Sequence, residues 1–156
     1  MLNIRRCSIA KRSAAARACS LVQLYVRLLE TDENGYGYCC SCGRLLTWGE
    51  SQGGHFHAKG RNYSAASFEE ENVHLQCANC NCAQGGNHSG YLIYMNKEYG
   101  QWDEANQEFT NPVVDHINTL IYTYLETEEV RTLARIYKQK CKDLAKSKNF
   151  QINIPS

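Results

Sequence analysis

The middle of the chain, from Cys39 to Asn81, reads CCSCGRLLTWGESQGGHFHAKGRNYSAASFEEENVHLQCANCN. It contains two Cys-x-x-Cys pairs, and four thiolates are the number that a closed tetrahedral zinc site takes. Gly43 directly follows the first pair, where a glycine permits the left-handed backbone of a zinc knuckle at low cost. The two matched pairs therefore predict a structural zinc site formed by Cys39, Cys42, Cys77 and Cys80.

The composition around these pairs also calls for a metal. Residues 34–90 are rich in Gly, Cys, Asn and His and poor in aliphatic side chains, so they cannot build a large apolar core. Cys40 and Cys82 compete for the same ion, but neither fits both the spacing and the pairing. No secretory apolar segment precedes the first turn, so we interpret the nine cysteines as thiols and metal ligands rather than disulfides.

Two histidines lie between the cysteine pairs, in the segment GGHFHAKGR that spans residues 53–61. In a strand, His55 and His57 point to the same face. An imidazole can take a proton from water or ligate a metal ion. Lys59 and Arg61 continue the alternation and could contact phosphate. Histidines that are flanked by glycines and cations inside a metal-held loop favour a functional role over a structural one.

Asn81 directly follows the last thiolate. A zinc knuckle would fix the backbone of this residue, so its amide oxygen could serve as a hard ligand for Mg²⁺ or Mn²⁺. The sequence therefore offers a second, catalytic ion site beside the structural one.

Helices are expected on both sides of this region. Apolar residues at spacings of three and four predict a helix from Ala14 to Leu29. Three further stripes follow: Tyr91 to Tyr99, ended at Gly100; Val113 to Tyr124; and Val130 to Leu144, with Thr127 as N-cap. We therefore expect one domain over residues 14–156, with a helix at 14–33, a zinc-containing core at 34–90 and a helical extension at 91–156.

Charge is strongly segregated, although the formal net charge is only +1. Residues 1–62 carry nine Lys/Arg against four Asp/Glu, residues 63–130 one against eleven, and residues 131–156 seven against one. Two basic ends could bind a polyanion such as DNA. They comprise an arm at residues 1–13, for which a mitochondrial presequence is the alternative, and a terminal helix bearing Lys138, Lys142 and Lys146. No apolar run approaches the roughly 18 residues of a membrane-spanning helix, so no membrane contact is expected.

The order of these motifs is similar to that of the HNH or ββα-metal nucleases, in the zinc-stapled form of the endonuclease VII-type junction resolvases. A closer resemblance, over roughly residues 20–145, is to the phage NinG family of recombination endonucleases, also called Rap. The residues that carry it are Cys39–Gly43, Gly54–Phe56, Phe68, Asn72–Cys77, Cys80–Asn81, Gly86–Asn87 and Tyr91.

This resemblance implies an α+β fold, in which a small zinc-stapled ββα-metal, HNH or treble-clef-like, core is flanked by N- and C-terminal helices. It implies a Mg²⁺- or Mn²⁺-dependent endonuclease that cleaves Holliday-junction or D-loop-type DNA in the cytoplasm of a bacterial host. His55 would be the general base, Asn81 a ligand of the catalytic ion, and Asn72 a residue that holds the loop or the histidine. Two cleavages of a symmetric junction suggest a homodimer.

One departure leaves the ion site open. Many HNH sites have an aspartate immediately before the catalytic histidine, but this chain has Gly54 there. His57 or His55 is then the nearest replacement ligand, with Glu69, Glu70 and Glu71 as more distant candidates. If His55 binds the ion, His57 becomes the base. The alternative function is a non-catalytic zinc module that binds DNA or protein. A redox role for the Cys-x-x-Cys pairs is disfavoured because no βαβ pattern surrounds them.

Overall fold

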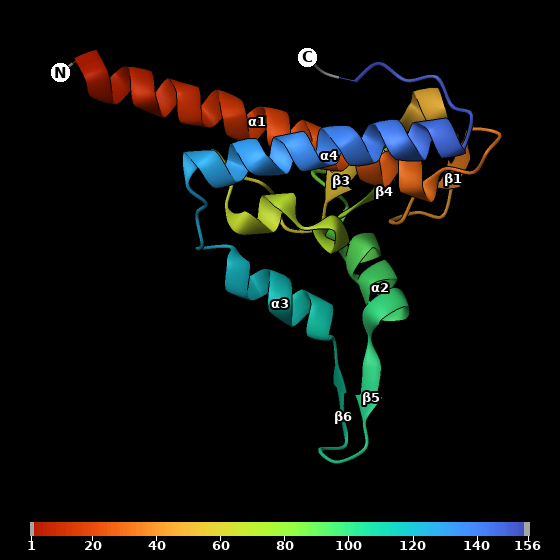
Figure 1. Cartoon of the computed structure of the whole chain (residues 1–156). Coiled ribbons are helices and arrows are strands. Elements are labelled where there is room, and N and C mark those ends of the chain that lie inside the picture. The colour runs from red at the N-terminus through yellow and green to blue at the C-terminus, as the bar shows by residue number, and fades with distance from the viewer. Residues whose placement is uncertain (1, 155–156) are drawn as a thin grey trace.

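The computed structural model describes the backbone of residues 2–154 and the side chains of residues 13–154. Its helices are α1 (Leu2–Glu30), α2 (His88–Tyr99), α3 (Pro112–Leu120) and α4 (Thr127–Ser147). The strands are β1 (Tyr36–Tyr38), β2 (Leu45–Thr47), β3 (Ser51–His55), β4 (Val73–Cys77), β5 (Gln101–Asp103) and β6 (Glu108–Thr110), which form three two-stranded antiparallel sheets. The expected mixture of helices and small sheets is confirmed (Figure 1).

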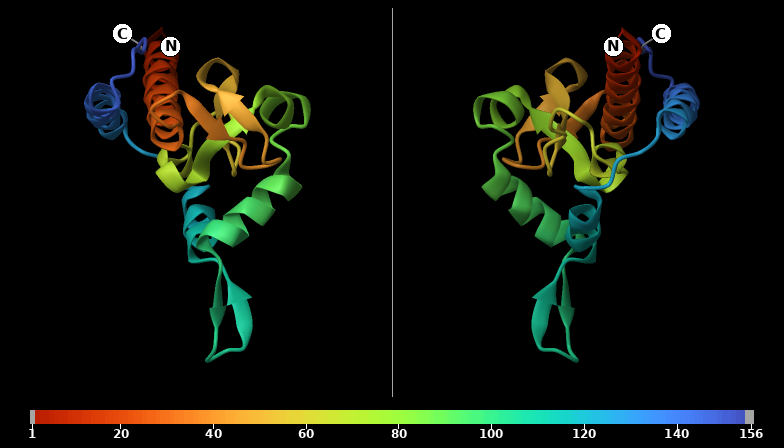
Figure 2. Two further views of the ribbon diagram at one scale, coloured as in Figure 1. Left: turned by 90° about the vertical axis from the view of Figure 1, so that its right-hand side faces the viewer. Right: turned by 90° about the vertical axis from the view of Figure 1, so that its left-hand side faces the viewer.

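The two long helices, α1 and α4, pack side by side along one side of the molecule (Figures 1 and 2). Leu21 and Val26 of α1 share a buried cluster with Val130 and Tyr137 of α4. Helix α1 begins at Leu2 rather than at Ala14, so the backbone of the predicted arm is continuous with the helix from residue 2. The side chains of residues 1–12 lie outside the described part of the chain.

Helix α4 also begins with a cap that differs slightly from expectation. Glu126, one residue before Thr127, is the N-cap, and Glu129 completes a capping box by accepting the Glu126 N–H. Glu128 and Glu129 lie in the first turn, where the helix dipole favours acidic side chains.

The centre of the molecule has the order β3, β4, α2. The β3–β4 register pairs Ser51 with Cys77 and His55 with Val73. β3 ends at His55, and residues 56–57 form a bend. The expectation that His55 and His57 share one strand face is therefore wrong, because alternation stops where the strand stops.

Consecutive glycines let β3 approach its neighbours closely. A Cβ at Gly53 would lie 2.9 Å from the Cβ of Gln23 on α1, and the Gln23 side-chain amide donates to the Gly53 carbonyl at 2.6 Å. A Cβ at Gly54 would lie 1.8 Å from Gln76 Oε1 on the paired strand. Both strand positions thus lack room for a side chain, and the helix and sheet close tightly around the backbone.

The segment from α2 to α3 extends away from the two long helices and ends in the β5–β6 hairpin (Figures 1 and 2). Tyr91 and Met95 of α2 are buried against Ile117 of α3. The predicted stripe of residues 113–124 ends early, since α3 stops at Leu120. The sequence patterns did not predict the hairpin, whose aromatic side chains Trp102 and Phe109 pair across the strands and are more than half exposed. Among the described residues, no helix is both long enough and apolar enough to cross a membrane.

Candidate metal centre and catalytic residues

The four cysteines of the two Cys-x-x-Cys pairs come together in space. All four Sγ atoms lie within 4.8 Å of one another, and those of Cys42 and Cys77 are 4.0 Å apart. A tetrahedral ion with metal–sulfur bonds of about 2.3 Å requires similar separations, so the cluster can hold a metal such as zinc. Cys40 and Cys82 are outside the cluster.

Each pair has the local backbone of a metal knuckle. Gly43 adopts a φ of 71°, as predicted, and its N–H donates to the Cys39 carbonyl at 2.8 Å. In the second pair, the Cys80 N–H donates to Cys77 Sγ at 3.4 Å. Burial raises the pKa of Cys80 to about 12. Burial also acts to raise the pKa of Cys77, but hydrogen bonds from the Cys80 N–H and from neighbouring thiols lower it to about 7.

Asn81 is held beside β3 by the second knuckle. Its Nδ2 donates to Gln52 Oε1 at 2.8 Å, and the Cys82 thiol donates to the same oxygen at 3.3 Å. Asn81 and Gln52 line a groove of about 370 Å³ against α1, to which Gln23 and Arg27 also contribute. Two amide side chains therefore meet on the surface, one from the knuckle and one from the strand.

Gln52 is a candidate that the sequence patterns missed. Its only sequence signal is its position in the Gly-Gly-His strand, three residues before His55. Placing it beside Asn81 requires the β3–β4 register, which no short turn sets because residues 56–72 separate the strands.

His55 lies at the other end of β3, between α1 and the short helix η2 (Ala65–Phe68). Its Nε2 is 3.1 Å from the Ser67 carbonyl and 3.6 Å from Cys19 Sγ. A carbonyl only accepts, so Nε2 carries the proton and Nδ1 has the free lone pair. Burial lowers the pKa of His55 to about 4, so the ring is neutral at pH 7.

Asn72 organises the bend after β3. It is fully buried, and its Oδ1 accepts from the His57 N–H at 2.7 Å. Its Nδ2 donates to the carbonyls of His57 at 3.2 Å and Ala66 at 2.7 Å. One buried amide thus fixes the backbone of His57 on both sides and ties it to η2.

The predicted catalytic residues are not gathered at one point. Gln52 and His55 are three residues apart in β3, which places their Cα atoms about 10 Å apart with side chains on opposite faces. Within residues 13–154, no hydrogen bond joins His55 or His57 to Asn81. Lys59 and Arg61 are exposed in the loop that follows.

The acidic candidates face elsewhere. Glu69 is 4.0 Å from His116 of α3, and Glu70 accepts from Tyr137 at 2.8 Å and from Lys140 of α4. Glu71 is exposed. Gly54 cannot be replaced by an acid without displacing the side chain of Gln76, which is anchored to Ser41 and Gly86. An aspartate immediately before His55 would therefore clash with Gln76.

Comparison with known proteins places the chain in a family. The family model "Bacteriophage Lambda NinG protein" matches residues 2–148. The protein ninG of Escherichia phage 933W is 32% identical over 152 residues, which cover 95% of this chain and 67% of that protein. The ninG proteins of Escherichia phage lambda and Salmonella phage P22 are 31% and 30% identical over 95% of this chain and 66% of their own lengths. No solved structure matches the chain. The chain therefore belongs to the NinG family.

Proposed function

We propose that this protein is a metal-dependent endonuclease that cleaves branched recombination DNA, such as Holliday junctions or D-loops. The observation that carries the proposal is the position of Asn81. The cysteine cluster holds this amide, and it contacts Gln52 on the strand that ends in His55. A metal-stapled knuckle, an amide and a neutral histidine on one β-β-α unit are a suitable set of groups for phosphodiester hydrolysis.

His55 acts as the general base. Its Nε2–H is occupied by the Ser67 carbonyl, which leaves Nδ1 to accept a proton from water. The water oxygen attacks phosphorus, the bond to the 3′ oxygen breaks, and the products are a 5′-phosphate and a 3′-hydroxyl. Asn72 fixes the bend after the base. Lys59 and Arg61 contact the scissile strand.

Two metals would serve different purposes. Zinc on the four thiolates would be structural, and it would keep Asn81 in place. Gln52 and Asn81 supply the neutral oxygens that Mg²⁺ or Mn²⁺ accepts, with His57 as a further candidate ligand. A divalent ion bound there would stabilise negative charge on a phosphate of the bound strand. With no carboxylate in the pair, we expect weak ion binding.

The test is cleavage of nicked, linear and four-way-junction DNA with and without Mg²⁺ or Mn²⁺. His55→Ala should retain zinc and DNA binding but lose cleavage by about 10²-fold or more, as expected for removal of a positioned base. Gln52→Glu should lower the Mg²⁺ concentration needed for half-maximal cleavage, because a carboxylate binds the ion more strongly than an amide. His116→Ala, an exposed histidine of α3, is the matched control.

Two features of the described residues 13–154 support a second candidate function: no hydrogen bond joins His55 to Asn81, and no carboxylate is hydrogen-bonded to Gln52. These features favour a non-catalytic zinc module that binds DNA. If no metal ion supports cleavage of any of the three substrates, the endonuclease proposal is wrong and the binding module stands.

A further inference from the structure

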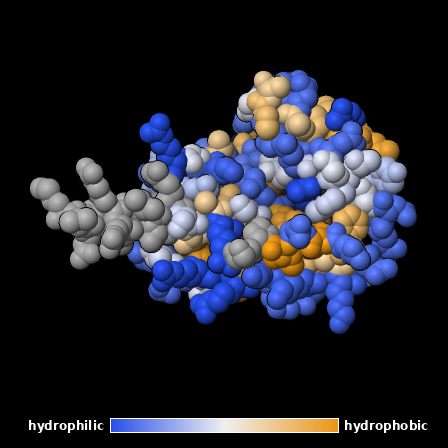
Figure 3. Space-filling model, turned by 90° about the horizontal axis from the view of Figure 1, so that it is seen from above, coloured by the Kyte–Doolittle hydropathy of each residue, from blue (hydrophilic) through white to orange (hydrophobic). Residues whose placement is uncertain are grey.

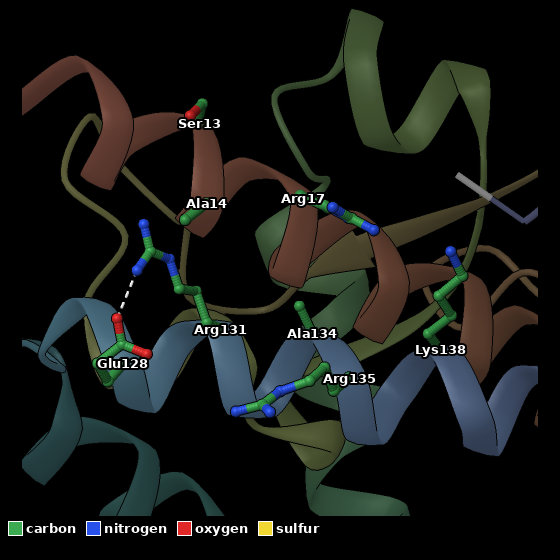
Figure 4. Close-up of a pocket in the computed structure, with 8 residues that line it drawn as sticks. All are labelled: Ser13, Ala14, Arg17, Glu128, Arg131, Ala134, Arg135 and Lys138. Atoms are coloured by element: carbon green, nitrogen blue, oxygen red, sulfur yellow. Dashed lines mark hydrogen bonds and ion pairs between the residues drawn. The ribbon is translucent and has the colours of Figure 1, made fainter. Parts of the chain in front are cut away.

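A groove between α1 and α4 gathers cations from both helices. It encloses about 670 Å³. Its charged lining consists of Arg17 from α1 and Glu128, Arg131, Arg135 and Lys138 from α4 (Figure 4). Hydrophilic side chains cover much of this side of the molecule when it is seen from above (Figure 3).

The charge in this groove is mostly uncompensated. Glu128 pairs with Arg131, and this is the ion pair drawn in Figure 4. Within residues 13–154, no ion pair joins Arg17, Arg135 or Lys138 to an acid. Like charges that face one groove repel one another, and a bound anion removes that repulsion. The groove therefore complements a negatively charged ligand.

The cations form a row rather than a ring. Arg131, Arg135 and Lys138 lie on one face of α4, because they are four and three residues apart in sequence. They span about 10 Å along the helix axis. Lys142 and Lys146 continue this face at further spacings of four. A row of this kind matches successive phosphates along a nucleic-acid backbone better than it matches one small anion.

Helix α1 connects this row to the candidate catalytic groove. Arg17 lines the cationic groove, while Gln23 of the same helix lines the groove that contains Gln52 and Asn81. Arg17 and Gln23 are six residues apart, or about 9 Å along the helix axis. Ser20 lies between them on the exposed side of α1 and also lines the second groove.

We propose that the α1–α4 groove binds the sugar-phosphate backbone of DNA next to the bond that is cleaved. This inference rests on the proposed endonuclease function and assigns Arg17, Arg135 and Lys138 as phosphate contacts. One strand of a duplex presents a phosphate about every 3.4 Å along its axis, so the contacted phosphates lie about three base pairs from the cut. Arg131 contributes less because Glu128 shares its charge.

The experiment measures binding of fluorescent duplex and four-way-junction DNA, without divalent ions, across a chloride series. The double variant Arg17→Ala/Arg135→Ala is compared with Arg44→Ala/Lys97→Ala, which removes two exposed cations outside the groove. Loss of two phosphate contacts should reduce the slope of log affinity against log salt by about 2 and weaken low-salt binding by about tenfold or more. Glu128→Gln should tighten binding a few-fold because it frees Arg131.

A second measurement locates the contact. A single neutral methylphosphonate linkage about three base pairs from the cut should weaken binding of the wild-type protein but not of the groove variant. Equal salt slopes for the groove and control variants would overturn the inference, even if the wild-type protein cleaves DNA. So would displacement of DNA by inorganic phosphate beyond the effect of chloride at equal ionic strength, because it would indicate a small-anion site. A slope difference without cleavage by the wild-type protein would support the groove and reject the endonuclease.

Discussion

At the scale of single residues, burial decides what His55 can do. The ring lies against Ser67 and Cys19, and this environment lowers its pKa to about 4. Cys19 is also buried, and burial raises the pKa of its thiol to about 11. Thiol and imidazole are therefore both neutral at pH 7, so they do not form the thiolate–imidazolium pair of a cysteine nucleophile. A neutral imidazole is the form that a general base requires.

The same burial predicts a pH dependence of stability. Between pH 6.5 and 4 the unfolded chain protonates His55 while the folded chain does not, so this residue makes the free energy of unfolding decrease as pH falls through that window. His55→Gln removes this contribution. We expect urea denaturation to show a steeper loss of stability for the wild-type protein, by up to about 3 kcal/mol across the window. Parallel curves for the two zinc-loaded proteins would contradict the buried, neutral ring.

At the scale of elements, glycines set how closely the pieces approach. Helix α2 begins against the first cysteine knuckle, where a Cβ at Gly90 would lie 2.1 Å from the backbone carbonyl oxygen of Ser41. Tyr91, the next residue, is buried and donates from its hydroxyl to the Gly54 carbonyl at 2.9 Å. The start of α2 is thus fixed to both the knuckle and β3, which positions the helix behind the candidate site.

This close approach predicts that Gly90→Ala is costly. The new methyl group must push α2 away from the backbone of the knuckle, which should destabilise the fold by about 1–3 kcal/mol. Gly49→Ala is the matched control, because no heavy atom lies within 4 Å of its Cβ position. That change should be neutral or slightly stabilising. Chemical denaturation of the two variants measures the difference, and equal stabilities would mean that α2 does not pack on the knuckle.

At the scale of the whole molecule, packing brings the two ends of the chain together. Helices α1 and α4 lie side by side, so cations from the basic ends meet in one groove rather than in two separate patches. The cysteines form a buried cluster with Leu46 and Leu75 that is separate from the cluster of α1 and α4 and from the cluster of α2 and α3. The region between these helices depends on the cysteines, since few large apolar side chains are buried there.

Removal of the metal should therefore disrupt the centre of the fold. We expect about one zinc per chain, and Cys80→Ser should lose both the zinc and the structure around β3 and β4. Structural zinc contributes about 10–16 kcal/mol in small metal-held domains, comparable to the whole stability of a typical protein. Elemental analysis and circular dichroism measure the two losses. Cys82→Ser is the control, because this exposed cysteine is outside the cluster. Full structure in a metal-free preparation would refute the expectation.

The sequence by itself determined the cysteine cluster, the mixture of helices and small sheets, and the left-handed turn at Gly43. These features follow from local spacing and from the conformational freedom of glycine, which do not depend on distant residues. The ends of helices were less well predicted because two neighbouring residues, such as Glu126 and Thr127, can both serve as the N-cap.

Tertiary structure alone decided the neighbours of each candidate residue. The contact of Gln52 with Asn81 depends on strand register across a long connection, and the neutrality of His55 depends on burial against α1 and η2. The cationic groove depends on the packing of two helices that are separated by most of the chain. Register, burial and helix packing are set by contacts between residues far apart in sequence, so no local pattern could specify them.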